Sequence, residues 1–467
     1  MVLVVSEQDQ DWPSLPCDRV PTGATHEVGV DELFFSTTDL LGVITAANPV
    51  FVRLSRFGYK ELMDAPHNII RHPVMPGGAF KLMWDTLKAG KPFCAYVDNL
   101  AADGSTYCVF ATITPLGQDS YLSVRSRPMA TALKAAADSL YRATRPLELM
   151  ARSNGESARR AAELGLEHLA NLLVAAGFPS YDEFMWNALA TEVGIRHTAA
   201  MRLERPAAAG PFAELLAGAH RLGEELHHWS GHEEQLSQVV KALDNGLPRL
   251  RAATDGALGA ARAFEDAAKD RFAPLLLSLT VWAEMMGEIN RLIEELEADL
   301  HRLRSSSTET IFRLALATLH TDTVAQFAVE LIDGVTVPDY DDQASRQALR
   351  LLGQALSEGF EATRLQEIAN AQLARDTAAK LDEIRDLITI PRSLIQQWQT
   401  MVAGSDDAAI ASLLPRVAAE VQRTDESLRL LADLAQECST IAQEPPPDAV
   451  NAELERLLAS IRSVDET

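Results

Sequence analysis

The sequence is short of paired cysteines, of positive charge and of recognisable catalytic motifs. Four cysteines, Cys17, Cys94, Cys108 and Cys438, are scattered over 467 residues without a CxxC pair. This spacing argues against a disulfide framework or a zinc site and indicates reduced thiols. Lys and Arg number 42 against 66 Asp and Glu, a net charge of −24. Because so negative a surface repels phosphate and anionic lipid, we expect no nucleic-acid or peripheral membrane binding.

Long apolar runs are also missing. No run reaches the roughly 18 consecutive apolar residues that a membrane-spanning helix needs. The nearest, residues 272–286, is shorter and contains Glu284. The N-terminal MVLVVSEQDQDWP has neither the basic segment nor the long apolar core of a signal peptide. We therefore expect a cytoplasmic protein without a membrane segment.

Motifs of common enzymes are absent. The sequence contains no GxGxxG, no GxxxxGK[ST] and no GxSxG, so we expect no catalytic activity. His220, Glu224, His228 and His232 recur every four residues, a spacing that stacks side chains along one helical stripe. Neighbouring members of such a stripe can bind a divalent metal. Gly231 and the drift of the stripe along a helix favour a solvated polar face instead, and no metal site is expected.

Strand-like and short helical patterns alternate early in the chain. Two short apolar runs within residues 34–48 precede two short helical segments. Residues 93–99 and 106–115 are strand-like and are joined by the hairpin turn of residues 102–105. Residues 121–127 supply a last strand. The pattern is therefore two strands, several short helices and three antiparallel strands.

The most distinctive stretch, APHNIIRHPVMPGGAFKLMWDTLKAGKP, covers residues 65–92. Two prolines bar helical continuation just after Arg71 and His72. An amphipathic helix follows, with Phe80 and Trp84 on its apolar side. A basic residue and a histidine thus stand side by side next to an aromatic helix. These residue types suit the wall of a site for an anionic aromatic cofactor.

Residues 30–128 resemble the PAS sensor of bacterial aerotaxis receptors. The shared sequence motifs are, in order, STTDL, IT-A-AN, PHN-x-x-RHP-x-MP and AF-x-x-MW-x-TLK-x-G-x-P. The resemblance implies an α+β PAS domain, with a five-stranded antiparallel sheet and short helices. It also implies a bound FAD and a role in sensing redox state or oxygen.

Five cofactor-binding residues are expected, and three of them follow from this resemblance. The family uses its Arg-His pair for FAD, which here is Arg71 and His72, and an implicated asparagine matches Asn48. Arg71 offers a fixed charge with several donors, and His72 can hydrogen-bond a ring or titrate with its redox state. Trp84 and Phe93 complete the expected site as aromatic neighbours of the ring.

Two departures from the family leave alternatives open. Val74 stands where the family has an acidic residue, and Phe93 replaces a tryptophan, which keeps an aromatic face but loses the indole donor. A PAS domain that is empty or differently loaded is one alternative. Haem is a minor alternative, with His67 or His72 as an axial ligand.

From Met129 onward the period becomes helical and the composition turns to Ala, Leu, Glu and Arg. We predict a helix over residues 131–144 that Arg145-Pro146 interrupts, and a later break at Asp244-Asn245-Gly246. The predicted organisation is a flexible N-terminal cap (1–29), the PAS domain (30–128), a helical linker and bundle (129–288), a long antiparallel helical hairpin (289–402), and C-terminal helices with a proline-containing tail (403–467). We expect Pro391, near the end of the hairpin, and Gly404 and Pro415, just after it, to break the helical pattern.

Leu292, Leu296 and Leu300 begin an apolar seam on the predicted hairpin. A continuous apolar stripe needs a partner helix, either from its own hairpin or from another chain. We expect a parallel homodimer. A chemoreceptor would have its kinase-control tip in this hairpin, but residues 314–331, LALATLHTDTVAQFAVEL, lack the arginines and glycines of that motif. Whether the protein binds chemotaxis-type signalling partners is therefore left open by the sequence.

Two functions fit the sequence. One is a cytosolic sensor in which a flavin-bearing PAS domain passes its state to a helical transmitter. The other is a non-enzymatic PAS dimerisation or scaffold protein without a cofactor.

Overall fold

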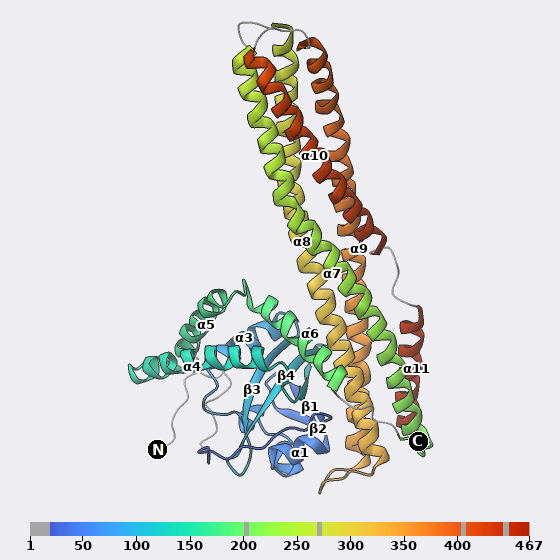
Figure 1. The fold of residues 1–467 in the computed structure, drawn as a ribbon. Helices are drawn as coiled ribbons and strands as arrows, with labels where there is room; N and C mark the ends of the chain where they lie inside the picture. The colour runs from blue at the N-terminus through green and yellow to red at the C-terminus, as the bar shows by residue number, and fades with distance from the viewer. Residues whose placement is uncertain (1–18, 200–204, 269–272, 403–407, 442–447, 467) are drawn as a thin grey trace. The chain divides into compact units, whose positions relative to one another are not determined.

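The computed structural model describes residues 19–199, 205–268, 273–402, 408–441 and 448–466 (Figure 1). The chain divides into two compact units. Unit 1 comprises Met1–Trp229, Ile311–Thr363 and Pro447–Thr467, and unit 2 comprises Ser230–Thr310 and Arg364–Pro446. These units do not follow the domain boundaries predicted at residues 288 and 402, because long helices contribute to both.

A five-stranded antiparallel sheet forms the N-terminal part of unit 1, as predicted. Its order is β2-β1-β5-β4-β3. Side chains of successive strand residues point to opposite faces. On β5, Leu122 and Val124 pack in the apolar core, while Tyr121, Ser123 and Arg125 alternate with them and line a cavity. The strands are β1 (Leu33–Asp39), β2 (Ile44–Ala47), β3 (Phe93–Leu100), β4 (Thr106–Leu116) and β5 (Ser120–Ser126).

Short helices connect β2 to β3. Asn48 caps the first of them, its Oδ1 accepting a hydrogen bond from the backbone N–H of Phe51 at 3.4 Å, and Pro49 follows at a position where no intrahelical donor is needed. Phe34 and Phe51 stack between this helix and the sheet, with ring centroids 5.8 Å apart. The helices are α1 (Pro49–Ser55), α2 (Tyr59–Leu62), the 3-10 helix η1 (His67–Ile70) and α3 (Gly77–Lys88).

The described end of the predicted N-terminal cap packs on the sheet. Thr25 pairs with Thr106, the first residue of β4. The ring of His26 hydrogen-bonds the hydroxyl of Ser105 at 3.0 Å and the carbonyl of Leu54 at 2.9 Å. Residues 19–29 are therefore part of the folded domain, and residues 1–18 lie outside the described chain.

Three helices follow the sheet: α4 (Thr131–Ser153), α5 (Ala158–Ala175) and α6 (Tyr181–Ala199). The interruption predicted at Arg145-Pro146 is wrong, because α4 continues through Pro146. The cost of an interior proline is offset here by the packing of α4 on α5 and of α5 on α3. Phe93 of β3 stacks on Tyr181 of α6, with centroids 5.2 Å apart and planes 8° from parallel.

Long helices make up the rest: α7 (Pro211–Ala268), α8 (Ala273–Ile332), α9 (Asp342–Val402), α10 (Ala408–Ile441) and α11 (Asp448–Glu466) (Figure 1). The break predicted at Asp244-Asn245-Gly246 is wrong, since α7 is continuous there. A Cβ on Gly246 would lie 2.5 Å from Cδ2 of Leu431, so this glycine makes room for α10 rather than for a turn. Pro391 and Pro415 lie inside α9 and α10, so the breaks predicted there are also wrong. Gly404 lies outside the described residues.

The apolar stripe of α8 packs against helices of its own chain. Leu292, Leu296 and Leu300 are 3%, 0% and 1% exposed within the core of unit 2, which also contains residues of α7, α9 and α10. Ile368 of α9, in contrast, is 56% exposed. The homodimer is not tested by these contacts and stays a prediction. Among the described helices, none is both long enough and apolar enough to cross a membrane.

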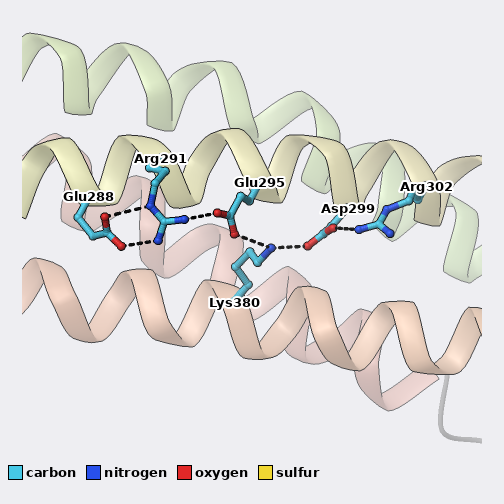
Figure 2. A network of polar contacts seen from close by, with 6 residues as sticks. All are labelled: Glu288, Arg291, Glu295, Asp299, Arg302 and Lys380. Atoms are coloured by element: carbon cyan, nitrogen blue, oxygen red, sulfur yellow. Dashed lines mark hydrogen bonds and ion pairs between the residues drawn. The ribbon is translucent and has the colours of Figure 1, made fainter.

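A chain of charged side chains links α8 to α9 in unit 2 (Figure 2). On α8, Arg291 contacts Glu288 and Glu295, and Arg302 contacts Asp299. Lys380 of α9 bridges two carboxylates of α8, with its Nζ 3.3 Å from Glu295 and 2.7 Å from Asp299. It is the residue of α9 that joins the network drawn in Figure 2.

Candidate functional site

A cavity of about 200 Å³ lies between the sheet and α3. The alternating side chains of β5 line one wall, and Phe80, Met83, Trp84 and Leu87 of α3 line the opposite wall. This volume is below the roughly 300–1,000 Å³ of most small-molecule pockets. Leu41, which also lines the cavity, is 81% exposed, so the cavity reaches the surface at this residue. A ligand larger than the enclosed space would extend outward past Leu41.

Arg125 of β5 places a buried positive charge at the cavity. Its side chain is 3% exposed overall, and both terminal nitrogens lie 3.1 Å from the hydroxyl of Ser36. The guanidinium also contacts Nε2 of His67 and lies 5.0 Å from the ring centroid of Phe51. Burial lowers the pKa of Arg125 to about 10, so it stays charged at neutral pH. Among the described residues, no carboxylate forms an ion pair with it.

Arg71 adds a second buried guanidinium to the lining. It is 8% exposed, donates to the carbonyl of Met75 at 3.3 Å, and lies 4.0 Å above the ring centroid of Phe80. Burial lowers the pKa of Arg71 to about 10; Arg145 acts in the same direction and Glu148 opposes it. No Asp or Glu is found among the described residues that line the cavity. Two cations without a lining carboxylate make the cavity suited to an anionic ligand.

Two neutral polar groups at the cavity have unused hydrogen-bonding capacity. Nδ2 of Asn99 and Oγ of Ser123 are buried, and neither has a hydrogen-bond partner within the described parts of the chain. Both residues line the cavity. Buried polar groups are nearly always hydrogen-bonded, so an orphaned pair facing one cavity indicates a ligand with polar atoms. Together with the two arginines and Trp84, they fit a planar ring with a polar edge that can become anionic, as in a flavin.

Two of the five residues predicted from sequence line this cavity. Arg71 is the first of them. Trp84 does so from α3, where its ring lies edge-on to Tyr121 with centroids 5.8 Å apart. A Cβ on Gly42, whose φ is +79°, would lie 3.1 Å from the Trp84 ring. Trp84 therefore packs between β5 and the turn that joins β1 to β2.

The other three predicted residues lie outside the lining. Asn48 donates from Nδ2 to Glu330 of α8 at 3.1 Å. His72 accepts from the backbone N–H of Val74 at 3.2 Å, and burial lowers its pKa, with Asp98 opposing. Phe93 is covered by Tyr181. Their roles toward a cofactor stay predictions, and the contacts they make here are with the protein itself.

His67 is the histidine that bears on the haem alternative, because it lines the cavity and His72 does not. Its Nε2 lies 3.3 Å from the hydroxyl of Ser36 and also contacts Arg125. Burial, and then the charge of Arg125, lower the pKa of His67 well below its usual value. Since its Nε2 is already engaged with a hydroxyl and a guanidinium, the site favours an anionic organic ring over axial ligation.

Sequence reasoning missed Arg125, Asn99 and Ser123 as site residues. A signal was present on β5, where Tyr121, Ser123 and Arg125 alternate with the apolar Leu122 and Val124. A charged side chain that faces inward from a buried strand is unusual and points to a ligand or a partner.

Comparisons with known proteins bear on the same domain. No protein-family model matches the chain. The aerotaxis receptor of Escherichia coli (strain K12) is 41% identical over 117 residues, which is 24% of this chain and 23% of that protein. The nitrogen fixation regulatory protein of Klebsiella pneumoniae is 32% identical over 81 residues, which is 17% of this chain and 16% of that protein. The chain thus spans about a quarter or less of the length of these curated relatives.

One solved structure is described by the words "Flavin Analogue Sheds Light on Light-Oxygen-Voltage Domain Mechanism". It is 21% identical, with a TM-score of 0.21, and the match covers 22% of this chain and 83% of that one. At this TM-score the likeness carries no argument about function.

The sheet order, the short helices that cover it and the similarity to the aerotaxis receptor define the N-terminal domain as a PAS sensor domain. A region of long helices follows it. The prediction of an α+β PAS domain followed by an all-α region is confirmed.

Proposed function

We propose that this protein is a signal-transduction sensor whose PAS domain binds a flavin and reports redox state or oxygen to its helical region. The carrying observation is the cavity between the sheet and α3, where Arg71 and Arg125 are buried and the lining has no described carboxylate. The orphaned polar atoms of Asn99 and Ser123 fit the polar edge of a flavin ring. Similarity to an aerotaxis receptor supports the sensing role.

When bound, a flavin supplies a ring that accepts electrons and can gain negative charge on reduction. The part of the chain in this chemistry is electrostatic. Arg71 and Arg125 would stabilise the added charge in a site where burial strengthens the interaction. Asn99 and Ser123 would orient the ring by hydrogen bonds, and Trp84 and Phe80 would cover it. FAD is the flavin we propose, because the wording of residues 65–92 resembles that of the aerotaxis sensors.

The test is purification of the full chain, followed by its absorption spectrum and chromatographic identification of any released cofactor. We expect the two-banded spectrum of an oxidised flavin, lost on reduction. Arg71→Gln and Arg125→Gln should each weaken flavin binding by about tenfold or more, because each removes a buried charged donor. Arg56→Gln is the matched control, since Arg56 forms an exposed ion pair with Asp103 in the same domain.

One outcome would contradict the sensor proposal. If the folded protein is colourless and binds neither FAD, FMN nor haem at micromolar concentration, the sensor proposal falls. The scaffold function without a cofactor then takes its place.

We propose further that the protein acts without catalysis and in the cytoplasm. Both curated relatives carry the names of a receptor or a regulator, which supports a signalling role. Cys94, Cys108 and Cys438 are free thiols, as is usual in a reducing compartment. A homodimer and chemotaxis-type partners are part of the same proposal, and sedimentation over a micromolar concentration range tests the dimer.

A further inference from the structure

Helix α3, which forms one wall of the cavity, is held at its start by a carboxylate from α4. Oε2 of Glu148 accepts from the backbone N–H of Gly77 at 2.7 Å, and Oε1 accepts from that of Gly78 at 2.8 Å. Glu148 is 1% exposed. The first N–H groups of a helix have no intrahelical acceptor, and the positive end of the helix dipole favours a negative charge there. These two bonds therefore fix α3 to α4.

Arg145, one turn earlier on α4, extends this contact to the loop before α3. Its Nη1 lies 3.0 Å from Oε2 of Glu148, and its Nε donates to the carbonyl of Pro73 at 3.0 Å. We refer to Glu148, Arg145, Gly77, Gly78 and Pro73 together as the clasp. One helix thus holds both the loop and the helix that follow the pocket-lining Arg71.

Glycines bring the backbones of α3 and α5 together at the clasp. A Cβ on Gly78 would lie 2.4 Å from the backbone N of Leu166 and 2.5 Å from the carbonyl carbon of Gly165. A Cβ on Gly165 would lie 2.0 Å from Oε1 of Glu148. Because backbone contacts backbone here, a shift of α3 cannot be absorbed by side-chain rotation and must be passed to α4 and α5.

The same α3 faces the cavity on its other side. Phe80 and Trp84 line the cavity, and the guanidinium of Arg71 lies 4.0 Å above the Phe80 ring. The charges of Arg145 and Glu148 are also near enough to act on the pKa of Arg71, after the larger effect of burial. The clasp is therefore linked to the cavity both through the body of α3 and through the field at Arg71.

We propose that the clasp is the point at which the state of the cavity is passed to helices α4 and α5, with Glu148 as its positioning residue. An anion bound at Arg71 changes the charge balance among Arg71, Arg145 and Glu148 and so changes how firmly α3 is held. Any such coupling is reciprocal, so loosening the clasp must also change affinity at the cavity. The nature of the ligand rests on the proposed function, but the coupling of Arg71 to Glu148 does not.

The first test needs no ligand. Hydrogen exchange of the full chain is measured for the wild type, Arg71→Gln, Glu148→Gln and the double variant. Glu148→Gln keeps the side-chain shape and removes the charge, and should reduce amide protection in α3 and α5 by about tenfold or more. Arg71→Gln should also change protection in α5, and the two effects should be non-additive. Additive effects, or no effect of Arg71→Gln on α5, would overturn the proposal.

Controls separate the clasp from general surface charge. Glu163→Gln removes a half-buried carboxylate of α5 that pairs with Arg159 and Arg160, and should leave the protection of α3 unchanged. If Glu148→Gln does not fold, Arg145→Gln weakens the clasp from the loop side and carries the same expectation.

The second test adds FAD to the wild type and to Glu148→Gln. We expect flavin binding to change the protection of α5 in the wild type and to leave it unchanged in the variant, although the variant still binds. Flavin binding without a change in α5 of the wild type contradicts the clasp and leaves the proposed function standing. If no flavin binds, the proposed function fails, and the ligand-free cycle still decides the coupling of Arg71 to Glu148.

Discussion

The side-chain amide of Asn48 donates to both carboxylate oxygens of Glu330, at 3.1 and 3.3 Å, and so joins the start of α1 to helix α8. Next to this contact, Phe35 of β1 meets Phe327 of α8 edge to face, with centroids 5.4 Å apart. The sequence resemblance assigned Asn48 to the cofactor, whereas the structure places it between the PAS domain and the helical region of unit 1. Asn48 is therefore a candidate for passing a signal from the PAS domain to α8, as well as for stabilising the fold.

Glu330 should make the stability of unit 1 depend on pH. Burial raises its pKa to about 8, while Asn48 and Arg53 oppose the shift and Glu32 adds to it. A carboxyl group with a raised pKa in the folded state binds its proton more tightly there than in the unfolded chain, where the pKa is about 4.3. Its stabilising contribution is complete below about pH 4.3 and is lost as the pH rises through about 8.

Glu330→Gln tests this sign. Between about pH 5 and pH 8, the wild type should lose thermal stability, because the folded chain keeps the proton of Glu330 while the unfolded chain releases it, and the variant should show a flatter profile. Glu167→Gln, at an exposed position on α5, should follow the wild type. The measurement is the melting temperature across this range. Parallel profiles for the wild type and Glu330→Gln would show that Glu330 does not control the pH dependence.

Lys380 should contribute more to unit 2 than an ordinary surface lysine. It lies between Glu295 and Asp299 (Figure 2), and its removal leaves two carboxylates of α8 facing α9 without their shared cation. Burial favours the neutral form of Asp299, but hydrogen bonds from Lys380 and Arg302 outweigh it and lower its pKa. The stabilisation from Asp299 is therefore present above its unfolded pKa and is lost as the pH falls through the lower folded value.

We expect Lys380→Gln to lower the free energy of unfolding by on the order of 1 kcal/mol, less in high salt. Arg385→Gln, which removes an exposed ion pair with Asp382 on the same helix, should cost less. Urea unfolding at low and high salt compares them. Equal costs for the two variants would mean that the network adds nothing beyond isolated pairs.

Gly78 should tolerate no side chain. Gly78→Ala would place a Cβ 2.4 Å from the backbone N of Leu166, and backbone cannot move aside as a flexible side chain can. We expect a loss of about 1–3 kcal/mol, as for other overpacked sites. Gly194→Ala is the matched control, because it lies in α6 with nothing within 4 Å of its Cβ position. There the better helix propensity of alanine should stabilise the protein by up to about 1 kcal/mol. Thermal unfolding of both variants decides, and equal shifts would contradict the close contact.

The PAS domain could be predicted from sequence because its information is local. The strands of residues 93–99 and 106–115 are fixed by alternation and by a hairpin turn, and the observed strands agree with them within a residue or two. Residues 65–92 contain a long sequence motif that resembles that of the aerotaxis sensors. Local patterns of this kind can be interpreted without knowledge of the tertiary contacts.

The errors came from residues whose meaning depends on distant partners. Gly246 reads as part of a turn in the sequence, but it is the place where Leu431 of α10 enters. Pro146 reads as a helix end, but α4 is held by its packing on α5. Arg125 reads as a charged strand residue, and only the fold shows that it is buried beside His67 and Ser36.

Arg125 should favour ligand binding at the expense of stability. It is fully buried without a described carboxylate partner, and a charge in that position costs folding free energy that its hydrogen bonds to Ser36 only partly offset. Arg125→Met keeps the length of the side chain and removes the charge. Ser36 and His67 can still bond one another, since they already lie 3.3 Å apart. We therefore expect the flavin-free variant to be as stable as the wild type, or more stable by about 1–2 kcal/mol.

The same substitution should weaken flavin binding by about tenfold or more, because a buried charged donor no longer faces the ring. Thermal unfolding without flavin and titration with FAD measure the two effects on one preparation. Arg127→Met is the control, since Arg127 follows β5 and pairs with Glu27 at the surface, and it should change neither quantity. A large loss of stability in Arg125→Met with unchanged flavin affinity would make Arg125 a structural residue of the sheet and not a ligand-binding one.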